Sequence, residues 1–198
     1  VLFRSMVGAV ALMVKIGFFD ALLTTSSFHA TQQKAEQGDA PAQLELGKKY
    51  LHGVGVEKDE YEALSWVLKS AEQSYPAGMR LAGLMYRDGH GTVKHPEASL
   101  RWLKRAFDAS DAMSAYFIGN IYEQGEGVEK NIETAFSWYQ QGADRGDSWS
   151  QYALGELYQY EDRGYRVDIR KALRWYQLSA KSGNLLAQHE MGRLYSHG

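Results

Sequence analysis

Residues 42–71 read AQLELGKKYLHGVGVEKDEYEALSWVLKSA, and their arrangement of glycine, tyrosine and tryptophan returns along the chain at intervals of 36 or 37 residues. The glycine and the tyrosine three residues after it recur as Gly47 and Tyr50, Gly83 and Tyr86, Gly119 and Tyr122, Gly155 and Tyr158, and Gly192 and Tyr195. The tryptophan recurs in the same register as Trp66, Trp102, Trp138 and Trp175. A fixed period of this length is typical of arrays in which each unit is one supersecondary element.

Each unit contains the signals of two helices. In the first unit, Asp39 and Pro41 are typical of a helix start. Gly53 can adopt the left-handed conformation that ends a helix, because it has no Cβ atom. Asp59 and Glu62 then resemble a capping box at the start of a second helix. The sequence therefore predicts antiparallel helix pairs joined by glycine-rich connections.

The recurring positions also predict how the two helices of a unit pack. Glycines of the Gly47 type leave room for the neighbouring helix, while the recurring tyrosines and tryptophans fill the remaining space. One pair cannot bury its apolar face alone, so the pairs are expected to stack. The connection from Tyr158 to Asp168 is one residue longer than the others and keeps only Gly164, so we expect it to be looser.

The complete pattern resembles the Sel-one-like repeat (SLR), a relative of the tetratricopeptide repeat. It runs through Ala42, Leu46-Gly47, Tyr50, Gly53-x-Gly55-Val56, Asp59, Ala63, Trp66 and Ala71. The resemblance covers residues 35–198, with units of about 35–70, 71–105, 106–142 and 143–179 and a partial unit of 180–198. It implies an all-α fold, namely a right-handed α/α solenoid of about four and a half units. It also implies a scaffold or adaptor for other proteins that is not an enzyme.

The two ends of the chain differ from the repeats. Residues 1–34 form an apolar leader or capping segment, in which Arg4, the apolar stretch Met6–Val14 and a small polar run before Ala30 resemble a secretory signal peptide. We therefore expect export to the periplasm of a bacterium, with a cytoplasmic chain as the alternative. Membrane contact is expected only through this segment, if it is uncleaved. Because residues 180–198 match only a first helix, we also expect the chain to stop in mid-repeat.

Composition removes several classes of function. The chain has 198 residues, with 22 Lys and Arg against 24 Asp and Glu, and this balance argues against a nucleic-acid partner. With 0 cysteines it has no disulfide and no Cys-ligated metal, and the Cys-rich SLR proteins discussed as β-lactam-binding are a different branch. The six histidines form no ligand pattern in the sequence, so we expect no metal and no cofactor.

Motifs for catalysis are weak. The recurring Gly-x-Gly loops lack the preceding strand and the third glycine of a dinucleotide fingerprint, so we interpret them as helix connectors. His189-Glu190 begins like a zinc-protease motif, but Arg193 stands where the second histidine is required. The alternative to a scaffold is a hydrolase, or a hydrolase-accessory repeat protein, that uses carboxylates or histidines such as Glu156 and His189 on the concave face.

The remaining variable positions predict a partner-binding face. In the resembled fold the first helices line the concave surface, and the positions that vary between units lie at i, i+3, i+7 and i+10 of these helices, on one side. We predict that a protein or peptide contacts Arg80, Arg87, Tyr116, Asn120, Glu123, Trp149, Tyr152 and Glu156. Tyr116 and Tyr152 are expected to stand side by side as anchors. Arg80 is expected to give the face a cationic end that favours an acidic ligand.

Overall fold

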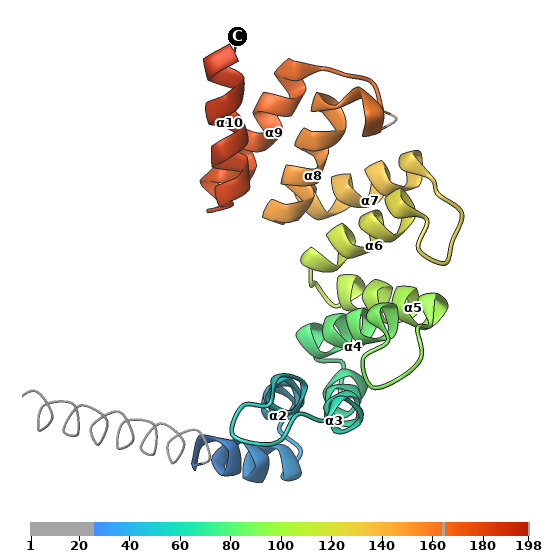
Figure 1. Cartoon of the computed structure of the whole chain (residues 1–198), viewed down its shortest axis with the longest axis vertical. Coiled ribbons are helices and arrows are strands. Elements are labelled where there is room, and N and C mark those ends of the chain that lie inside the picture. Colours follow the sequence, from blue (N-terminus) through green and yellow to red (C-terminus); the bar gives the residue numbers. More distant parts are fainter. Residues whose placement is uncertain (1–25, 164, 198) are drawn as a thin grey trace, which may run out of the picture.

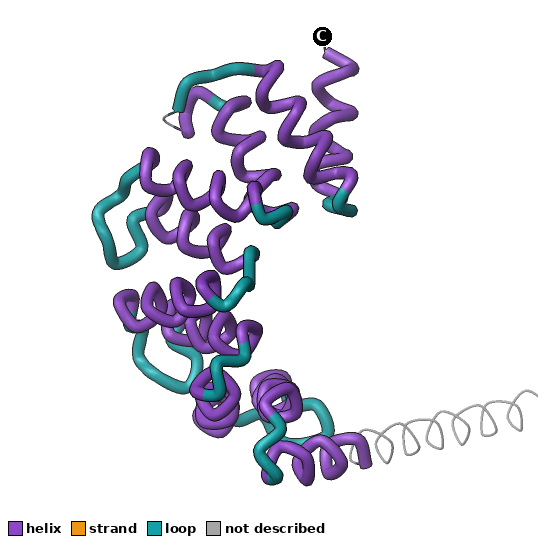
Figure 2. Tube along the Cα trace, turned by 180° about the vertical axis from the view of Figure 1, so that it is seen from behind, coloured by secondary structure: helices purple, strands orange, loops and turns teal. Residues whose placement is uncertain are grey.

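The computed structural model describes residues 26–197 apart from residue 164. In this part of the chain there are helices and loops and no strand (Figure 2). Residues 26–36 are helical, and the helices that follow are α2 (Ala40–His52), α3 (Glu60–Glu72), α4 (Pro76–Asp88), α5 (Pro96–Asp108), α6 (Met113–Gln124), α7 (Ile132–Asp144), α8 (Ser148–Gln159), the 3-10 helix η1 (Glu161–Arg163), α9 (Ile169–Lys181) and α10 (Leu185–His197). The predicted all-α repeat fold is confirmed.

The helices begin and end where the sequence signals them. The Asp39 side chain accepts a 2.7 Å hydrogen bond from the backbone N–H of Ala42 at the start of α2. Gly53 ends that helix with φ of 70°, a left-handed conformation that L residues adopt only with strain. Asp59 accepts from the second and third N–H groups of α3, and the same position in the next unit is filled by His95, whose Nδ1 accepts from the backbone of α5.

The helices pack as successive antiparallel pairs, α2 with α3, α4 with α5, α6 with α7 and α8 with α9, and α10 packs on α9. The pairs follow one another in a curved array, with the first helix of each pair on the inner side (Figure 1). First helices of neighbouring units also contact each other directly, as α2 does α4 and α6 does α8. The variable positions of the first helices therefore belong to the inner half of the array.

The close approach within each pair occurs at the recurring glycine. A Cβ atom on Gly83 would lie 2.7 Å from Cγ of Leu103, which is shorter than the distances that Cβ atoms keep from other heavy atoms in proteins. The side chain that fills this space is the residue after each tryptophan, and the tryptophans themselves are half-buried beside it. The residues that face the glycines in the four units are Val67, Leu103, Tyr139 and Tyr176.

The connectors that follow α4, α6 and α8 lie one after another along one edge of the array (Figure 2). A Cβ on Gly91 would overlap the carbonyl oxygen of Glu60 at the start of α3, and one on Gly127 would overlap the ring of Pro96 at the start of α5. Each of these two connectors therefore nests against the second helix of the unit before it. The connector after α8 was expected to be looser, and the structure shows contacts on both sides of residue 164: Arg163 bonds two carboxylates, and Tyr165 stacks on Phe136 at 4.5 Å.

The helix over residues 26–36 packs on the first unit. Its Phe28 is 6% exposed, and its ring lies edge-on to that of Tyr50 at 5.6 Å. Cleavage after Ala30, as a signal peptide would require, would remove Phe28 from this cluster. The apolar stretch Met6–Val14 lies outside the described residues. Among the helices described, none is long and apolar enough to cross a membrane.

Candidate protein-binding surface

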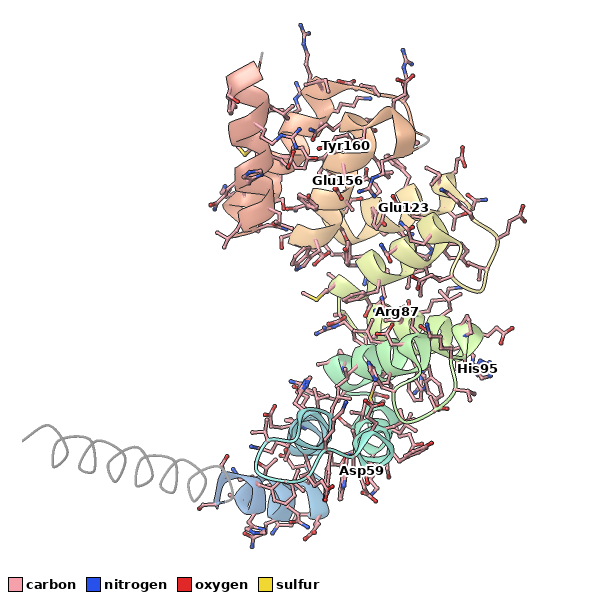
Figure 3. The ribbon with its side chains drawn as sticks, in the orientation of Figure 1. Asp59, Arg87, His95, Glu123, Glu156 and Tyr160 are labelled. Atoms are coloured by element: carbon pink, nitrogen blue, oxygen red, sulfur yellow. The ribbon has the colours of Figure 1, made fainter. Side chains whose placement is uncertain are left out.

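The eight residues predicted to contact a partner all lie on first helices. Figure 3 labels Glu123 and Glu156 in the C-terminal half of the array and Arg87 one unit earlier. The eight are distributed over three helices, with Arg80 and Arg87 on α4, Tyr116, Asn120 and Glu123 on α6, and Trp149, Tyr152 and Glu156 on α8. Their contacts divide them into residues with an available surface and residues already engaged inside the protein.

The two arginines of α4 are paired within the protein. Nε of Arg80 lies 2.9 Å from a carboxylate oxygen of Asp111, which also caps α6. Nε of Arg87 lies 2.8 Å from Asp88 and 4.0 Å from Glu126. The expected free cationic end of the face is therefore absent, because Asp88 of the same helix and Asp111 and Glu126 from neighbouring loops pair with the two guanidinium groups.

Glu123 is not a surface residue, which corrects the expectation that it contacts a partner. It is 4% exposed, and the hydroxyl of Tyr139 donates a 2.7 Å hydrogen bond to its Oε2. Arg163 of η1 donates to its Oε1 at 2.6 Å. A buried carboxylate requires such partners, since an unpaired buried charge is costly. Glu123 therefore holds the units together.

Glu156 lies beside this pair and remains partly open. Its side chain is 21% exposed, and its Oε1 accepts from Arg163 at 3.0 Å and from the hydroxyl of Tyr152 at 3.2 Å. No described residue donates a hydrogen bond to its Oε2. Burial raises the pKa of the Glu156 carboxyl, and Arg163 opposes the shift only in part. Arg163 thus bridges two carboxylates from adjacent units.

The aromatic residues of the face form a contact different from the expected one. Tyr116 was predicted to stand beside Tyr152, but its ring pairs with Trp149 at 5.8 Å between centroids, while Tyr152 pairs with Tyr176 at 5.6 Å. Tyr116 also lies 6.0 Å from the buried ring of Tyr139. Tyr116 is therefore partly buried in the core, and Trp149 is the more exposed aromatic residue of the face.

An apolar cleft opens next to Trp149, between the start of α8 and the turn from α9 to α10. Its volume is about 520 Å³, and its lining residues are Ser148, Trp149, Ser182, Gly183, Asn184, Leu185 and Leu186. Trp149 is 37% exposed, Leu186 49% and Leu185 74%. Leu185 and Leu186 were not predicted as binding residues, although Leu186 occupies the Trp149 position in the next unit and that register was the available signal.

The groups named for a hydrolase do not meet in the described structure. His189 is paired with its neighbour Glu190, its Nδ1 lying 3.4 Å from the carboxylate, and Glu156 is bonded to Arg163 and Tyr152 instead. Within the described residues, no group of three His, Asp or Glu side chains is placed to hold a metal ion.

Comparison with protein families identifies the repeat. The Sel1 repeat model matches residues 40–75, 76–111, 112–147, 150–184 and 185–198. The chain belongs to the Sel1 repeat family. The matched units begin five to seven residues later than the predicted ones. They start at or near the beginning of each first helix, whereas the predicted units start within the end of the helix before it. Sel1 repeat proteins are generally scaffolds for protein–protein interaction, and their fold is typically non-catalytic.

Solved structures of similar proteins share the fold. A Sel1 repeat protein from Oxalobacter formigenes is 34% identical over 95% of this chain and 79% of its own, with a TM-score of 0.80. The protective antigen c5321 of uropathogenic Escherichia coli, described as displaying an SLR fold, is 32% identical over 86% of this chain but only 36% of its own, with a TM-score of 0.73. The immunity protein Pa5087 from Pseudomonas aeruginosa is 26% identical over 81% of this chain and 59% of its own, with a TM-score of 0.59. None of the curated proteins compared with the chain matches it.

Proposed function

We propose that this Sel1 repeat protein is a non-catalytic scaffold that binds a partner protein or peptide on the inner face of its first helices. The observation that carries the proposal is the cleft beside Trp149, where a half-exposed indole and two exposed leucines gather on one inner edge. Tryptophan is the residue type most often found at the energetic centre of an interface.

The surroundings of Trp149 favour binding because they restrict its movement before a partner arrives. Its ring rests against Tyr116 of α6, and Tyr116 in turn contacts the buried ring of Tyr139. A side chain already held in place loses little conformational entropy on binding, so more of the contact energy is available for affinity. Trp149, on α8, thus has the ring of Tyr116 on one neighbouring element and lines the same cleft as the α9–α10 turn.

An extended segment suits this surface. The cleft of about 520 Å³ can hold one or two large side chains, and the inner face continues from it along α8 past Tyr152 to Glu156. Solenoid proteins use their extended concave surfaces for binding, and such a surface can follow an extended segment. The proposed location, the periplasm of a bacterium, rests on the signal-like sequence of residues 1–30 alone.

Affinity purification tests the proposal. Purified chain, immobilised and incubated with a lysate or periplasmic extract of its source organism, is expected to retain a partner that mass spectrometry identifies. Trp149→Ala is expected to lose that partner, while Tyr61→Ala, which removes an aromatic side chain that is 77% exposed on α3, is expected to keep it. Retention by a folded Trp149→Ala variant would place the site elsewhere.

Tyr116→Ala/Tyr152→Ala is a weaker test of the same idea. Tyr116 and Tyr152 contact the buried rings of Tyr139 and Tyr176, so their truncation also disturbs packing between units. Trp149→Ala removes the exposed anchor and leaves those contacts in place.

A further inference from the structure

The inner face of the two central units carries more negative than positive charge. Helices α6 and α8 contain the carboxylates of Glu123 and Glu156 and no lysine, arginine or histidine. Among the described residues, the cation in contact with both is Arg163 of η1. One unit earlier, Arg80 is matched by Asp111, and Arg87 lies among Asp88 and Glu126. Two carboxylates sharing one guanidinium leave one negative charge at the middle of the face.

This charge is directed outward at Glu156. Glu123 is buried, and both of its carboxylate oxygens accept hydrogen bonds, one from Tyr139 and one from Arg163. In Glu156 only Oε1 accepts the hydrogen bonds from Tyr152 and Arg163, and the side chain is partly exposed to solvent. The hydroxyl of Tyr152 bonds to this carboxylate, and Tyr116 of α6 is near enough to interact with it electrostatically. An approaching ammonium or guanidinium group therefore finds a carboxylate oxygen to which no described residue donates a hydrogen bond.

The distance from this carboxylate to the apolar cleft is set by helix geometry. Trp149 and Glu156 are seven residues apart on α8, so they lie on the same side, about 10 Å apart along the axis. A peptide in the polyproline II conformation has three residues per turn and advances about 3.1 Å per residue, so its residues i and i+3 lie on one side, about 9 Å apart. A side chain in the cleft and one at Glu156 would therefore belong to peptide residues i and i+3, or to i and i−3 in the opposite direction.

We propose that the partner segment presents a large apolar residue to the cleft lined by Trp149, Leu185 and Leu186 and, three residues away, a lysine or arginine to Glu156. The proposal rests on the proposed function, and it names the chemistry of the partner as a basic segment with an apolar anchor. It replaces the acidic ligand expected from Arg80, because that arginine is already neutralised by Asp111.

A phage-displayed library of random eight-residue peptides, panned on the purified chain, tests the proposal without knowledge of the natural partner. The enriched peptides are expected to share Leu, Ile, Phe, Met or Trp three positions from Lys or Arg. The most enriched peptide is then synthesised with a fluorescent label, together with a version in which the basic residue is replaced by Glu. Binding is measured by fluorescence anisotropy.

Two variants, each with a matched control, measure how much the apolar contact and the charged contact contribute to binding. Trp149→Ala is expected to weaken binding by at least about 30-fold, as loss of an interface anchor does. Glu156→Gln, which keeps an acceptor for Tyr152 and Arg163, is expected to weaken the basic peptide about tenfold and to improve the Glu version. Tyr61→Ala and Glu133→Gln, both exposed on second helices, are expected to leave both affinities unchanged.

The outcomes separate this proposal from the broader one. Enrichment of acidic or uncharged peptides whose binding still depends on Trp149 would overturn the basic partner and leave the scaffold function intact. Enrichment of basic peptides that ignore both Trp149→Ala and Glu156→Gln would also overturn it, because the contact would then lie elsewhere. A library that yields no peptide would overturn recognition of a short segment, while affinity purification still tests the scaffold function.

Discussion

The hydroxyl of Tyr139 donates a 2.7 Å hydrogen bond to Oε2 of Glu123, sixteen residues earlier on the other helix of its unit. In the next unit, Tyr176 donates a 2.6 Å bond to Gln159 at the equivalent positions. The corresponding pairs in the first two units are Val67 with Leu51 and Leu103 with Arg87. The C-terminal half of the array thus fills its helix interfaces with phenol rings and supplies each hydroxyl with an acceptor.

Arg163→Ala is expected to lower the free energy of unfolding by about 1–3 kcal/mol, because it leaves the buried Glu123 carboxylate without its cation. Arg166→Ala, an exposed arginine in the same connector, is expected to change stability by less than about 0.5 kcal/mol. Adding Glu123→Gln to Arg163→Ala should recover part of the loss. Urea denaturation followed by circular dichroism checks all three, and equal midpoints for the two arginine variants would refute the bridging role.

Glu156 predicts a pH dependence whose sign can be worked out. Burial raises the pKa of its carboxyl in the folded state, so between the unfolded and the folded pKa the folded state binds more protons. Its contribution to stability is therefore greatest at low pH and declines as the pH rises through the folded pKa. Glu156→Gln cannot ionise, so the stability of this variant relative to the parent chain should increase from pH 4 to pH 7. Denaturation midpoints that differ by a constant amount over this range would contradict the expectation.

The pKa of Glu60, at the start of α3, is shifted in the opposite direction to that of Glu156. The ammonium of Lys58 at 2.8 Å and the imidazole of His90 at 3.2 Å lower the pKa of its carboxyl to about 2. Because the folded pKa is depressed, the stability that Glu60 contributes is present above its unfolded pKa and is lost as the pH falls through the folded one. NMR titration of the Glu60 carboxyl checks the value. Lys58→Ala, added salt and, to a lesser extent, His90→Ala should each raise the pKa.

Gly83 and Gly192 form a matched pair for the close packing of helices. Gly83→Leu is expected to cost about 1–3 kcal/mol or more, because any Cβ at this position meets Leu103 and the backbone of α5. Gly192→Ala has no neighbour within 4 Å of the new Cβ and should stabilise α10 by up to about 1 kcal/mol through helix propensity. Thermal melts measure both variants. A Gly83→Leu chain as stable as the parent would mean that the helices need no close approach.

Phe28 tests whether the helix over residues 26–36 belongs to the folded array. Phe28→Ala is expected to destabilise the first unit by about 3–5 kcal/mol, because the ring is buried against Tyr50 and the start of the array. Gln33→Ala on the exposed side of the same helix should have little effect. Hydrogen exchange of the α2 amides reports the loss locally, and unchanged protection in Phe28→Ala would show that α2 does not depend on the helix before it.

The helix pairs could be predicted because their determinants are local and repeated. Asp39 and Gly53 mark the two ends of α2 within fourteen residues, and the same signals return in later units. The residues that face the glycines could not be predicted from the sequence. Val67 and Tyr139 occupy the same position in their units and are both buried, but they are different residue types. Burial depends on the neighbouring helix, which a comparison of residue types does not reveal.

The candidate site was less predictable because its charges are paired between segments that are far apart in the sequence. Arg80 meets Asp111 from a turn 31 residues away, and Glu123 meets Arg163 from a connector 40 residues away. The irregular connector after Tyr158 suggested a loose loop, yet the extra length carries the arginine that binds two helices. The position of Trp149 in the variable register predicted that its side chain is exposed. The sequence did not predict that Leu185 and Leu186 lie beside it, because the turn between α9 and α10 brings them there.

Repeat arrays are in principle modular, because each unit contacts only its neighbours. The second unit comes closer to that description, since its helix interface is filled by the apolar side chain of Leu103. The third and fourth units do not, because Arg163 of one completes the buried Glu123 of the other. Any recombination, duplication or transplantation of parts of this array should therefore treat residues 112–184 as one indivisible cassette.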